Sequence, residues 1–163
     1  MMSDSPIRIL IQSDPALLQV LHLIQESFSF MTGRIDPPSS MHSLTLQDLT
    51  KMAQTDWILG MGDPVKACVV ASPRNHALYL GKIAVDSSLR GQGIARVLVH
   101  ACERIAMDLG LDRLELQVRI ELVENQNAFA KMGFVKTSEN CHQGYDRVTE
   151  ITMQKFFVMG GLL

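Results

Sequence analysis

The residues best suited to chemistry lie in one short segment, Arg90-Gly91-Gln92-Gly93. Glycine lets a backbone turn sharply and approach a ligand closely, and Arg90 adds a permanent charge with several hydrogen-bond donors. The apolar run before the segment, residues 77–85, predicts a buried strand, and the amphipathic run after it, residues 94–109, predicts a helix. The first N–H groups of such a helix have no partner inside it, and the helix dipole favours negative charge there. The segment therefore predicts a site for an anion such as a phosphate or pyrophosphate.

Two common phosphate-binding motifs do not fit this segment. A Walker-type loop requires Lys and then Ser or Thr after its last glycine, whereas Ile94 and Ala95 follow Gly93. A dinucleotide fingerprint requires Gly or Ala three residues after its second glycine, and Arg96 occupies that position. Glu115 lies at a distance that suits a ribose-binding acid, but the rest of the chain is too short for a two-half nucleotide fold.

Composition and charge narrow the class of protein further. A chain of 163 residues, of which 47% are hydrophobic, predicts a single domain over residues 1–163 with a substantial core. A formal net charge of −2 gives no electrostatic reason to expect nucleic-acid binding. The three cysteines are far apart and predict neither a disulfide framework nor a metal site, which fits a cytoplasmic location. No signal-peptide pattern and no apolar run of about 18 residues is present, so we expect no membrane partner.

The periodicity of the chain predicts an α/β fold with a mixed sheet. Asp14-Pro15 predicts the start of a helix whose apolar positions share one face, and a second helix is expected over residues 45–54. The loop between these helices contains two prolines, which favours an ordered loop. Strands are expected at residues 7–11, 57–61, 65–71, 77–85, 114–118, 134–137 and 148–153, with a short helix at 123–132.

Two motifs resemble those of a known family. The pattern Arg90-x-x-Gly93-x-Ala95 resembles the Arg/Gln-x-x-Gly-x-Gly/Ala motif of the GNAT-type N-acetyltransferases. Asn125, followed by Phe129-Ala130-Lys131-Met132-Gly133-Phe134, resembles the family's Asn, short helix and Tyr-x-x-x-Gly-Phe pattern. The order of the expected elements is also similar to the GNAT fold over essentially the whole chain. The resemblance implies a mixed, mostly antiparallel central sheet of about seven strands flanked by about four helices.

The resemblance also implies that acetyl-CoA binds at this segment as a co-substrate, with no metal. Backbone groups of the strand over residues 83–85 would pair with the pantetheine arm, and the loop N–H groups would surround the pyrophosphate. Asn125 would contact the pantetheine arm, although it could equally be a helix cap. The residues expected around the cofactor are Ile83, Ala84, Val85, Arg90, Gly91, Gln92, Gly93, Ile94, Ala95, Arg96, Asn125 and Phe129.

The chain departs from the family pattern at Phe129, where many relatives carry a tyrosine that protonates the leaving thiolate. Phenylalanine has no proton to give, so Phe129 is interpreted as a core residue. Tyr145, with His142 beside it, is the candidate substitute, although a tyrosine in a hairpin is often a packing residue. Glu26, at the end of the first helix, is the candidate base, with a solvated surface carboxylate as the simpler interpretation.

The proline-containing loop carries the candidate residues for acceptor binding. Arg34, Asp36 and Ser39 lie in the segment that would wall the acceptor site in a GNAT fold. Both signs of charge on a rigid loop suit recognition of a polar amine, and a surface turn with a local ion pair is the alternative interpretation.

The sequence therefore predicts a cytoplasmic N-acetyltransferase. It would move an acetyl group from acetyl-CoA to a primary amine of a small molecule or peptide, directly in a ternary complex, because no cysteine stands where an acyl-enzyme would form. A catalytically weak acyl-CoA-binding sensor is the alternative, and a domain without any cofactor is a third hypothesis. The acceptor and the acyl length do not follow from the sequence, and a homodimer is left open.

Overall fold

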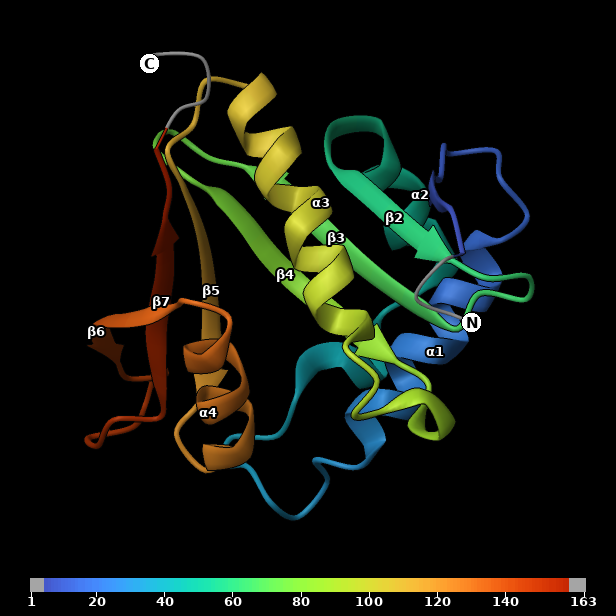
Figure 1. The fold of residues 1–163 in the computed structure, drawn as a ribbon. Coiled ribbons are helices and arrows are strands. Elements are labelled where there is room, and N and C mark those ends of the chain that lie inside the picture. Colours follow the sequence, from blue (N-terminus) through green and yellow to red (C-terminus); the bar gives the residue numbers. More distant parts are fainter. Residues whose placement is uncertain (1–4, 159–163) are drawn as a thin grey trace.

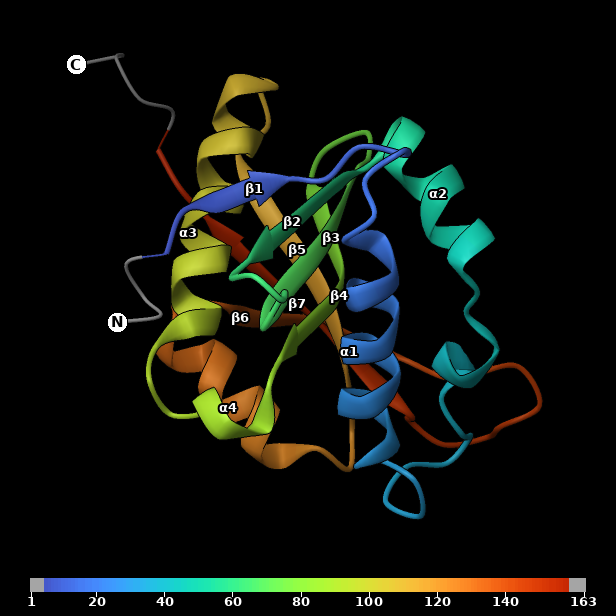
Figure 2. The same cartoon turned by 90° about the vertical axis from the view of Figure 1, so that its right-hand side faces the viewer.

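The computed structural model describes residues 5–158 as a three-layer molecule. A seven-stranded sheet in the order β1-β2-β3-β4-β5-β7-β6 forms the middle layer. Helices α1 and α2 cover one face of this sheet, and α3 and α4 cover the other (Figures 1 and 2). The strands are β1 (Ile7–Ile9), β2 (Trp57–Met61), β3 (Ala67–Pro73), β4 (Leu78–Val85), β5 (Arg113–Arg119), β6 (Val135–Asn140) and β7 (Glu150–Phe156). The helices are α1 (Leu17–Ser29), α2 (Leu46–Thr55), α3 (Ile94–Asp108) and α4 (Val123–Lys131).

The pairing of the strands confirms the predicted fold class. β4 and β5 pair in parallel, and the other neighbouring strands pair antiparallel. The parallel pair needs a crossover, and α3 supplies it on one face of the sheet. The order of strands and helices is the one that the sequence predicts.

Local signals in the sequence explain where several helices begin and end. The Asp14 carboxylate accepts a hydrogen bond from the Ala16 N–H at 2.9 Å, just before α1. At α2, Thr45 and Asp48 form a reciprocal capping box. After α3, Gly110 adopts a φ of +76°, a conformation that glycine accepts without strain.

The structure differs from the predicted elements by two or three residues at the ends of several strands and in two short 3₁₀ helices, of which one is Ser87–Leu89. The first strand ends at Ile9, two residues early, although the N–H of the buried Leu10 still bonds to the carbonyl oxygen of Ile58 in β2. The other 3₁₀ helix, Ser40–Ser43, was not predicted either. It begins where the Ser39 hydroxyl accepts a hydrogen bond from the Met41 N–H, a local bond that hydrophobic periodicity does not report.

Apolar side chains fill the space on both faces of the sheet. On one face, Leu98, Cys102 and Ala106 of α3 pack in one buried cluster. On the other, Ile24 of α1 and Leu49 of α2 belong to a second cluster. Burial on both faces explains why β3 is apolar at successive positions instead of alternating.

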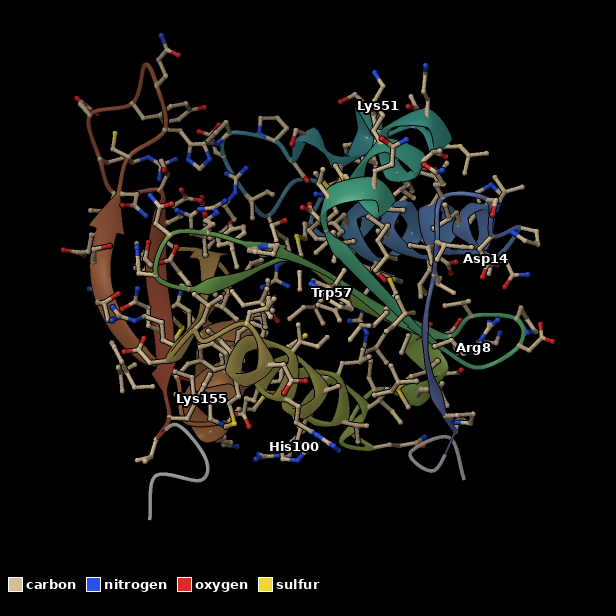
Figure 3. All side chains as sticks on the ribbon, turned by 90° about the horizontal axis from the view of Figure 1, so that it is seen from above. Arg8, Asp14, Lys51, Trp57, His100 and Lys155 are labelled. Atoms are coloured by element: carbon tan, nitrogen blue, oxygen red, sulfur yellow. The ribbon has the colours of Figure 1, made fainter. Side chains whose placement is uncertain are left out.

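Ionisable side chains connect α3 to β7. The Lys155 Nζ of β7 lies 2.5 Å from Oε1 of Glu103, whose other oxygen lies 3.3 Å from Nδ1 of His100. Figure 3 shows Lys155 and His100 on the α3 side of the sheet. The carboxylate is mostly buried and therefore requires such partners.

The feature of the fold that prepares a site is the divergence of β4 from β5. Within residues 5–158 these strands pair only at Leu78↔Leu114 and Tyr79↔Glu115, and beyond that point they separate, as Figure 1 shows. An irregularity in the register of β3 with β4, opposite Gly81, accompanies the change of direction. The edge of β4 from Leu80 to Val85 therefore has no strand partner on the β5 side.

Candidate active site

The larger of two cavities lies where the loop before α3 meets α1 and α4. Its volume is about 630 Å³. Its lining residues come from the end of α1, the last residues of β4, the 89–96 segment and α4. They are Ser27, Phe28, Phe30, Met31, Arg34, Ile83, Ala84, Val85, Leu89, Arg90, Gly91, Gly93, Ile94, Ala95, Arg96, Leu122, Glu124, Asn125, Ala128, Phe129, Lys131 and Met132.

Helix α3 begins in the wall of this cavity with free N–H groups. Gly91 and Gly93 have φ values of +79° and +77°, which residues with a Cβ rarely adopt. Gly93 is the cap residue of α3, and no side chain within the described residues caps the helix there. The N–H groups of the first turn are thus left for a ligand, and the helix dipole favours an anionic one.

The charges of the larger cavity are mainly positive. Its lining contains four cationic side chains and one carboxylate, Glu124, which pairs with Arg34 at 2.5 Å. The cations that remain are Arg90, Arg96 and Lys131. Arg90 lies over the Phe30 ring at 5.2 Å, a contact that positions a guanidinium without neutralising it. The cavity therefore suits an anion with several negative charges.

A smaller cavity of about 280 Å³ adjoins the first and lies where β4 and β5 separate. The two cavities share six lining residues: Phe28, Met31, Ile83, Leu122, Asn125 and Phe129. A ligand in the larger cavity can therefore reach a ligand in the smaller one past the unpaired edge of β4.

The smaller cavity is lined by a phenol and an imidazole, neither of which occurs in the lining of the larger one, and by a carboxylate. The Tyr79 hydroxyl donates to Oε1 of Gln117 at 3.1 Å, and burial raises the pKa of Tyr79. Glu150 contributes a carboxylate, and His142 contributes an imidazole whose Nε2 lies 3.9 Å from Oε2 of Glu150. Arg119 is the cation among the lining residues.

A loop over residues 33–40 closes one side of the smaller cavity, and distant side chains hold it. Nη1 of Arg119 donates to the carbonyl oxygen of Pro37 at 2.7 Å. The Asp36 carboxylate accepts two hydrogen bonds, from the Tyr145 hydroxyl at 2.6 Å and from Nη2 of Arg147 at 3.3 Å. The loop is thereby tied to β5 and to the segment between β6 and β7.

The structure brings most residues of the expected cofactor group together. Gln92 is exposed and is not among the lining residues, whereas the other eleven line the larger cavity. Asn125 lies inside α4 and does not cap it, so the helix-cap interpretation is wrong. Phe129 packs edge to face on Phe134 at 5.6 Å and lines both cavities, which agrees with its interpretation as a core residue.

The expected acceptor and catalytic residues are more scattered. Ser39 lines the smaller cavity, Arg34 lines the larger one, and Asp36 lines neither. Glu26 is exposed, also outside both linings. Tyr145 lies outside them as well, and its bond to Asp36 raises the pKa of its hydroxyl. The catalytic roles of Tyr145 and Glu26 stay predictions.

Sequence reasoning did not find Tyr79, Gln117 or Glu150 as site residues. Tyr79 is hidden in an apolar run, and Glu150 lies at the start of the last strand. Buried and more exposed residues alternate along β5, which places Gln117 on the more polar side of that strand. This alternation is the local signal that could have pointed to Gln117. Neither a group of three metal-ligating side chains nor a helix suited to crossing a membrane occurs in residues 5–158.

Comparison with known proteins agrees with this geometry. A model of the "Acetyltransferase (GNAT) family" matches residues 17–134. Human N-acetyltransferase 8B is 25% identical over 119 residues, which cover 69% of this chain and 52% of that protein. The rat N-acetyltransferase 8B is 30% identical over 105 residues, 58% of this chain and 47% of that protein. The matched part thus spans about half the length of these curated relatives.

Solved structures show the same fold at low sequence identity. The PaiA N-acetyltransferase from Thermoplasma acidophilum, in complex with coenzyme A, superposes with a TM-score of 0.78 at 16% identity, covering 93% of this chain and 98% of that chain. The ribosomal-protein-S18-alanine N-acetyltransferase from Escherichia coli gives 0.69 at 20% identity, with 97% of each chain covered. A chain of the NatC complex bound to Gag peptide and CoA gives 0.66 at 20% identity, covering 94% of this chain and 98% of that one.

Proposed function

Since the chain belongs to the acetyltransferase (GNAT) family, we propose that it transfers an acetyl group from acetyl-CoA to a primary amine. Acetyl-CoA would bind in the larger cavity and the amine in the smaller one. The observation that carries the proposal is the uncapped start of α3, which faces a cationic cavity next to a second, polar cavity. The structures of the Thermoplasma acidophilum enzyme and of the NatC complex, both with coenzyme A, support it.

Each part of the cofactor has a counterpart in the larger cavity. The N–H groups of the 91–96 segment, with Arg90 and Arg96, would hold the pyrophosphate. The free edge of β4 at residues 83–85 would bond the pantetheine arm as an added strand does. An N–H group near Val85 would then polarise the carbonyl of the acetyl thioester that the cofactor supplies.

A direct transfer in a ternary complex fits the cysteines of the described chain. Burial raises the pKa of the Cys68 and Cys102 thiols to about 12, so neither is a thiolate at neutral pH. Cys141 is exposed but lines neither cavity. Three free thiols also support a reducing location such as the cytoplasm.

The acceptor would be a small amine or a peptide amine. The NatC structure contains a peptide, and the S18-alanine enzyme is named for a protein substrate, which supports a peptide acceptor. The small volume of the acceptor cavity, about 280 Å³, supports entry of one amine-bearing group. Arg34, Asp36 and Ser39 would act through the 33–40 loop beside it.

One observation favours a second function, an acyl-CoA sensor with weak catalysis. Phe129 lies at the junction of the cavities where it can donate no proton to a leaving thiolate. A coenzyme A thiol has a pKa of roughly 8.5, so its thiolate leaves without much help, and we favour the enzyme. Thiol release from acetyl-CoA in the presence of a panel of primary amines and peptides distinguishes the two.

The binding of coenzyme A is tested with a matched pair of glycine variants. Gly93 and Gly110 stand at opposite ends of α3 with φ values of +77° and +76° and open space at the position of a Cβ. Gly93→Glu and Gly110→Glu therefore share the same backbone strain, and only Gly93→Glu places a carboxylate at the proposed phosphate site. We expect calorimetry to show coenzyme A binding at least tenfold weaker in Gly93→Glu, about 1.4 kcal/mol, and unchanged in Gly110→Glu. Equal affinity of Gly93→Glu and wild type would refute the site.

A further inference from the structure

We propose that His142 and Glu150 together bind the ammonium group of the acceptor and that His142 removes its proton. The inference rests on the proposed function, because it assigns the amine site and the base within the smaller cavity. Both side chains line that cavity, and they are 29% and 19% exposed. A ligand in the cavity can therefore reach both without a change in the fold.

The spacing of the two groups suits one shared nitrogen. Nε2 of His142 lies 3.9 Å from Oε2 of Glu150, which is too long for a direct hydrogen bond. One ammonium nitrogen placed between the two atoms can donate a hydrogen bond of ordinary length to each. An ammonium also offers several donors, so one remains for a third partner.

A neighbouring threonine sets the orientation of the imidazole. The Thr149 hydroxyl lies 2.5 Å from Nδ1 of His142, and it accepts a bond from the His142 N–H at 2.9 Å. The carbonyl oxygen of Asn140, 3.5 Å away, can accept the one hydroxyl hydrogen. In the proposed tautomer Nδ1 donates to the hydroxyl oxygen, which leaves the lone pair of Nε2 for the ligand, as a base requires.

The charges around the pair favour a cationic ligand. The other charged or titratable lining residues are Tyr79 from β4 and Arg119 from β5. Burial, and to a smaller extent the charge of Glu150, raises the pKa of Tyr79 above its usual value, so the phenol stays neutral. Arg119 is engaged with the carbonyl oxygens of Pro37 and Pro38. The Glu150 carboxylate is therefore free to attract an ammonium group.

In the proposed transfer the acceptor nitrogen loses two protons, one to His142 and one to the leaving sulfur. The ammonium group, held by Glu150, gives one proton to Nε2 of His142 and becomes a nucleophilic amine. As its lone pair forms the C–N bond to the acetyl carbon, the C–S bond breaks and the sulfur takes the electron pair. The second proton lost by the nitrogen ends on that sulfur, so amide and thiol are released. The proton on His142 returns to solvent.

The kinetic test compares His142 with a second histidine at the same distance from a carboxylate. His76 Nε2 also lies 3.9 Å from a carboxylate, that of Glu115, but the pair lies outside both cavities. Asn at position 142 can keep a donor near Thr149 while it removes Nε2. With methylamine as acceptor, His142→Asn should lower kcat/KM at least about 100-fold, since general bases contribute ~10²–10⁴-fold. The KM for acetyl-CoA and the activity of His76→Asn should not change.

Two further variants separate a catalytic role from a structural one. His142→Gly should recover turnover when free imidazole is added, which a packing residue would not. Glu150→Gln should raise the KM for methylamine more than it lowers kcat, because it removes a charge that binds the ammonium group. Wild-type turnover in both His142→Asn and His142→Gly would overturn the proposal.

A measurement without acetyl-CoA keeps this inference distinct from the proposed function. Nitrogen-15 NMR of the histidine rings should show His142, identified by its loss in His142→Asn, with the proton on Nδ1. Added methylamine should shift its Nε2 resonance, and Glu150→Gln should weaken that shift. A proton on Nε2, or no response to methylamine, would contradict the proposal even if coenzyme A binds at α3.

Discussion

At the scale of single residues, Asp36 organises the loop that borders the acceptor cavity. Its carboxylate accepts hydrogen bonds from Tyr145 and Arg147, and its N–H donates to Oε2 of Glu121 at 3.2 Å. These partners lie about 110 and 85 residues away along the chain. Asp36 lines neither cavity, so we expect it to influence acceptor binding by holding the 33–40 loop instead of touching the acceptor.

The role of Tyr145 follows from the same contact. We expect Tyr145→Phe to raise the KM for the acceptor severalfold, because it removes the hydroxyl that fixes Asp36 while the ring stays in place. Steady-state kinetics with the best amine of the panel measure this change. Asp36→Asn should act in the same direction, and the KM for acetyl-CoA should be unchanged in both variants. A lower kcat with an unaltered acceptor KM would instead support Tyr145 as the acid that protonates the thiolate.

The two cavities differ in how far the sequence could predict them. Ten of the 22 residues that line the larger cavity lie between Ile83 and Arg96, so their spacing alone indicates a strand, a loop and a helix start. The proposed acceptor site joins Tyr79, Gln117 and Glu150 from three strands. Only the register of the sheet and the divergence of β4 from β5 bring these three side chains together. Local patterns carry no information on either.

At the scale of elements, α2 and α3 differ in whether a side chain caps the first turn of the helix. In α2 the Thr45 hydroxyl accepts from the Asp48 N–H at 3.1 Å, and the Asp48 carboxylate accepts from the Thr45 N–H at 2.9 Å. In α3 Gly93 offers no side chain to its first turn. The cap of α2 therefore satisfies N–H groups of its first turn, whereas the uncapped start of α3 lies in the wall of the larger cavity, where a ligand can bond to them.

The capping box of α2 gives a prediction for stability. Thr45→Ala should lower the free energy of unfolding by about 1 kcal/mol, because it leaves an N–H group at the helix start without its acceptor. Urea denaturation measures this difference. Thr50→Ala is the matched control, since Thr50 lies within the same helix and Ala has the higher helix propensity. Equal losses in the two variants would show that the cap does not stabilise α2.

The same box makes stability depend on pH. The bonds from Thr45 hold the pKa of Asp48 below its ordinary value. A carboxyl with a lowered folded-state pKa contributes stability above its unfolded pKa, about 3.9 for Asp, and loses that contribution as the pH falls through the folded pKa. Asp48→Asn should therefore be less stable than wild type at pH 6, and denaturation curves should converge toward pH 3. A constant difference at all pH values would contradict this origin.

Elements were easier to predict than their roles. The periodicity of residues 17–28 and 94–109 predicted α1 and α3 with only small errors at their ends, because a long amphipathic pattern has few alternatives. Asn125 shows the limit of such reasoning. Its residue type suits a cap, but α4 begins at Val123, so Asn125 lies within the first turn and lines both cavities.

At the scale of the whole molecule, the proposed cofactor site bridges parts of the fold that contact each other weakly. One wall of the larger cavity comes from β4 and the start of α3, and the other comes from α4. Within residues 5–158 the sheet joins these parts only through the two-residue pairing of β4 with β5. One side-chain bond also joins the walls, from Nη2 of Arg96 to the carbonyl oxygen of Lys131 at 3.4 Å. A ligand that contacts both walls therefore adds to few existing connections.

This bridging leads to a prediction for hydrogen exchange. Coenzyme A should slow amide exchange in the first turn of α3 and in α4 together, because it contacts both and binds only the folded state. Saturation at about 100 times the dissociation constant should also stabilise the protein by about 2.7 kcal/mol against unfolding. Exchange measured by mass spectrometry, with and without coenzyme A, reports each segment separately.

Helix α2 and the Gly93→Glu variant provide the controls for the exchange experiment. No residue of α2 lines either cavity, so its amides should gain protection only through global stabilisation. The Gly93→Glu variant should show less protection in α3 and α4 than wild type at the same concentration of coenzyme A, because its weaker binding reduces the stabilisation. Protection confined to α3 would mean that the ligand contacts a single wall, and the acetyl group would then lie too far from the acceptor cavity for direct transfer.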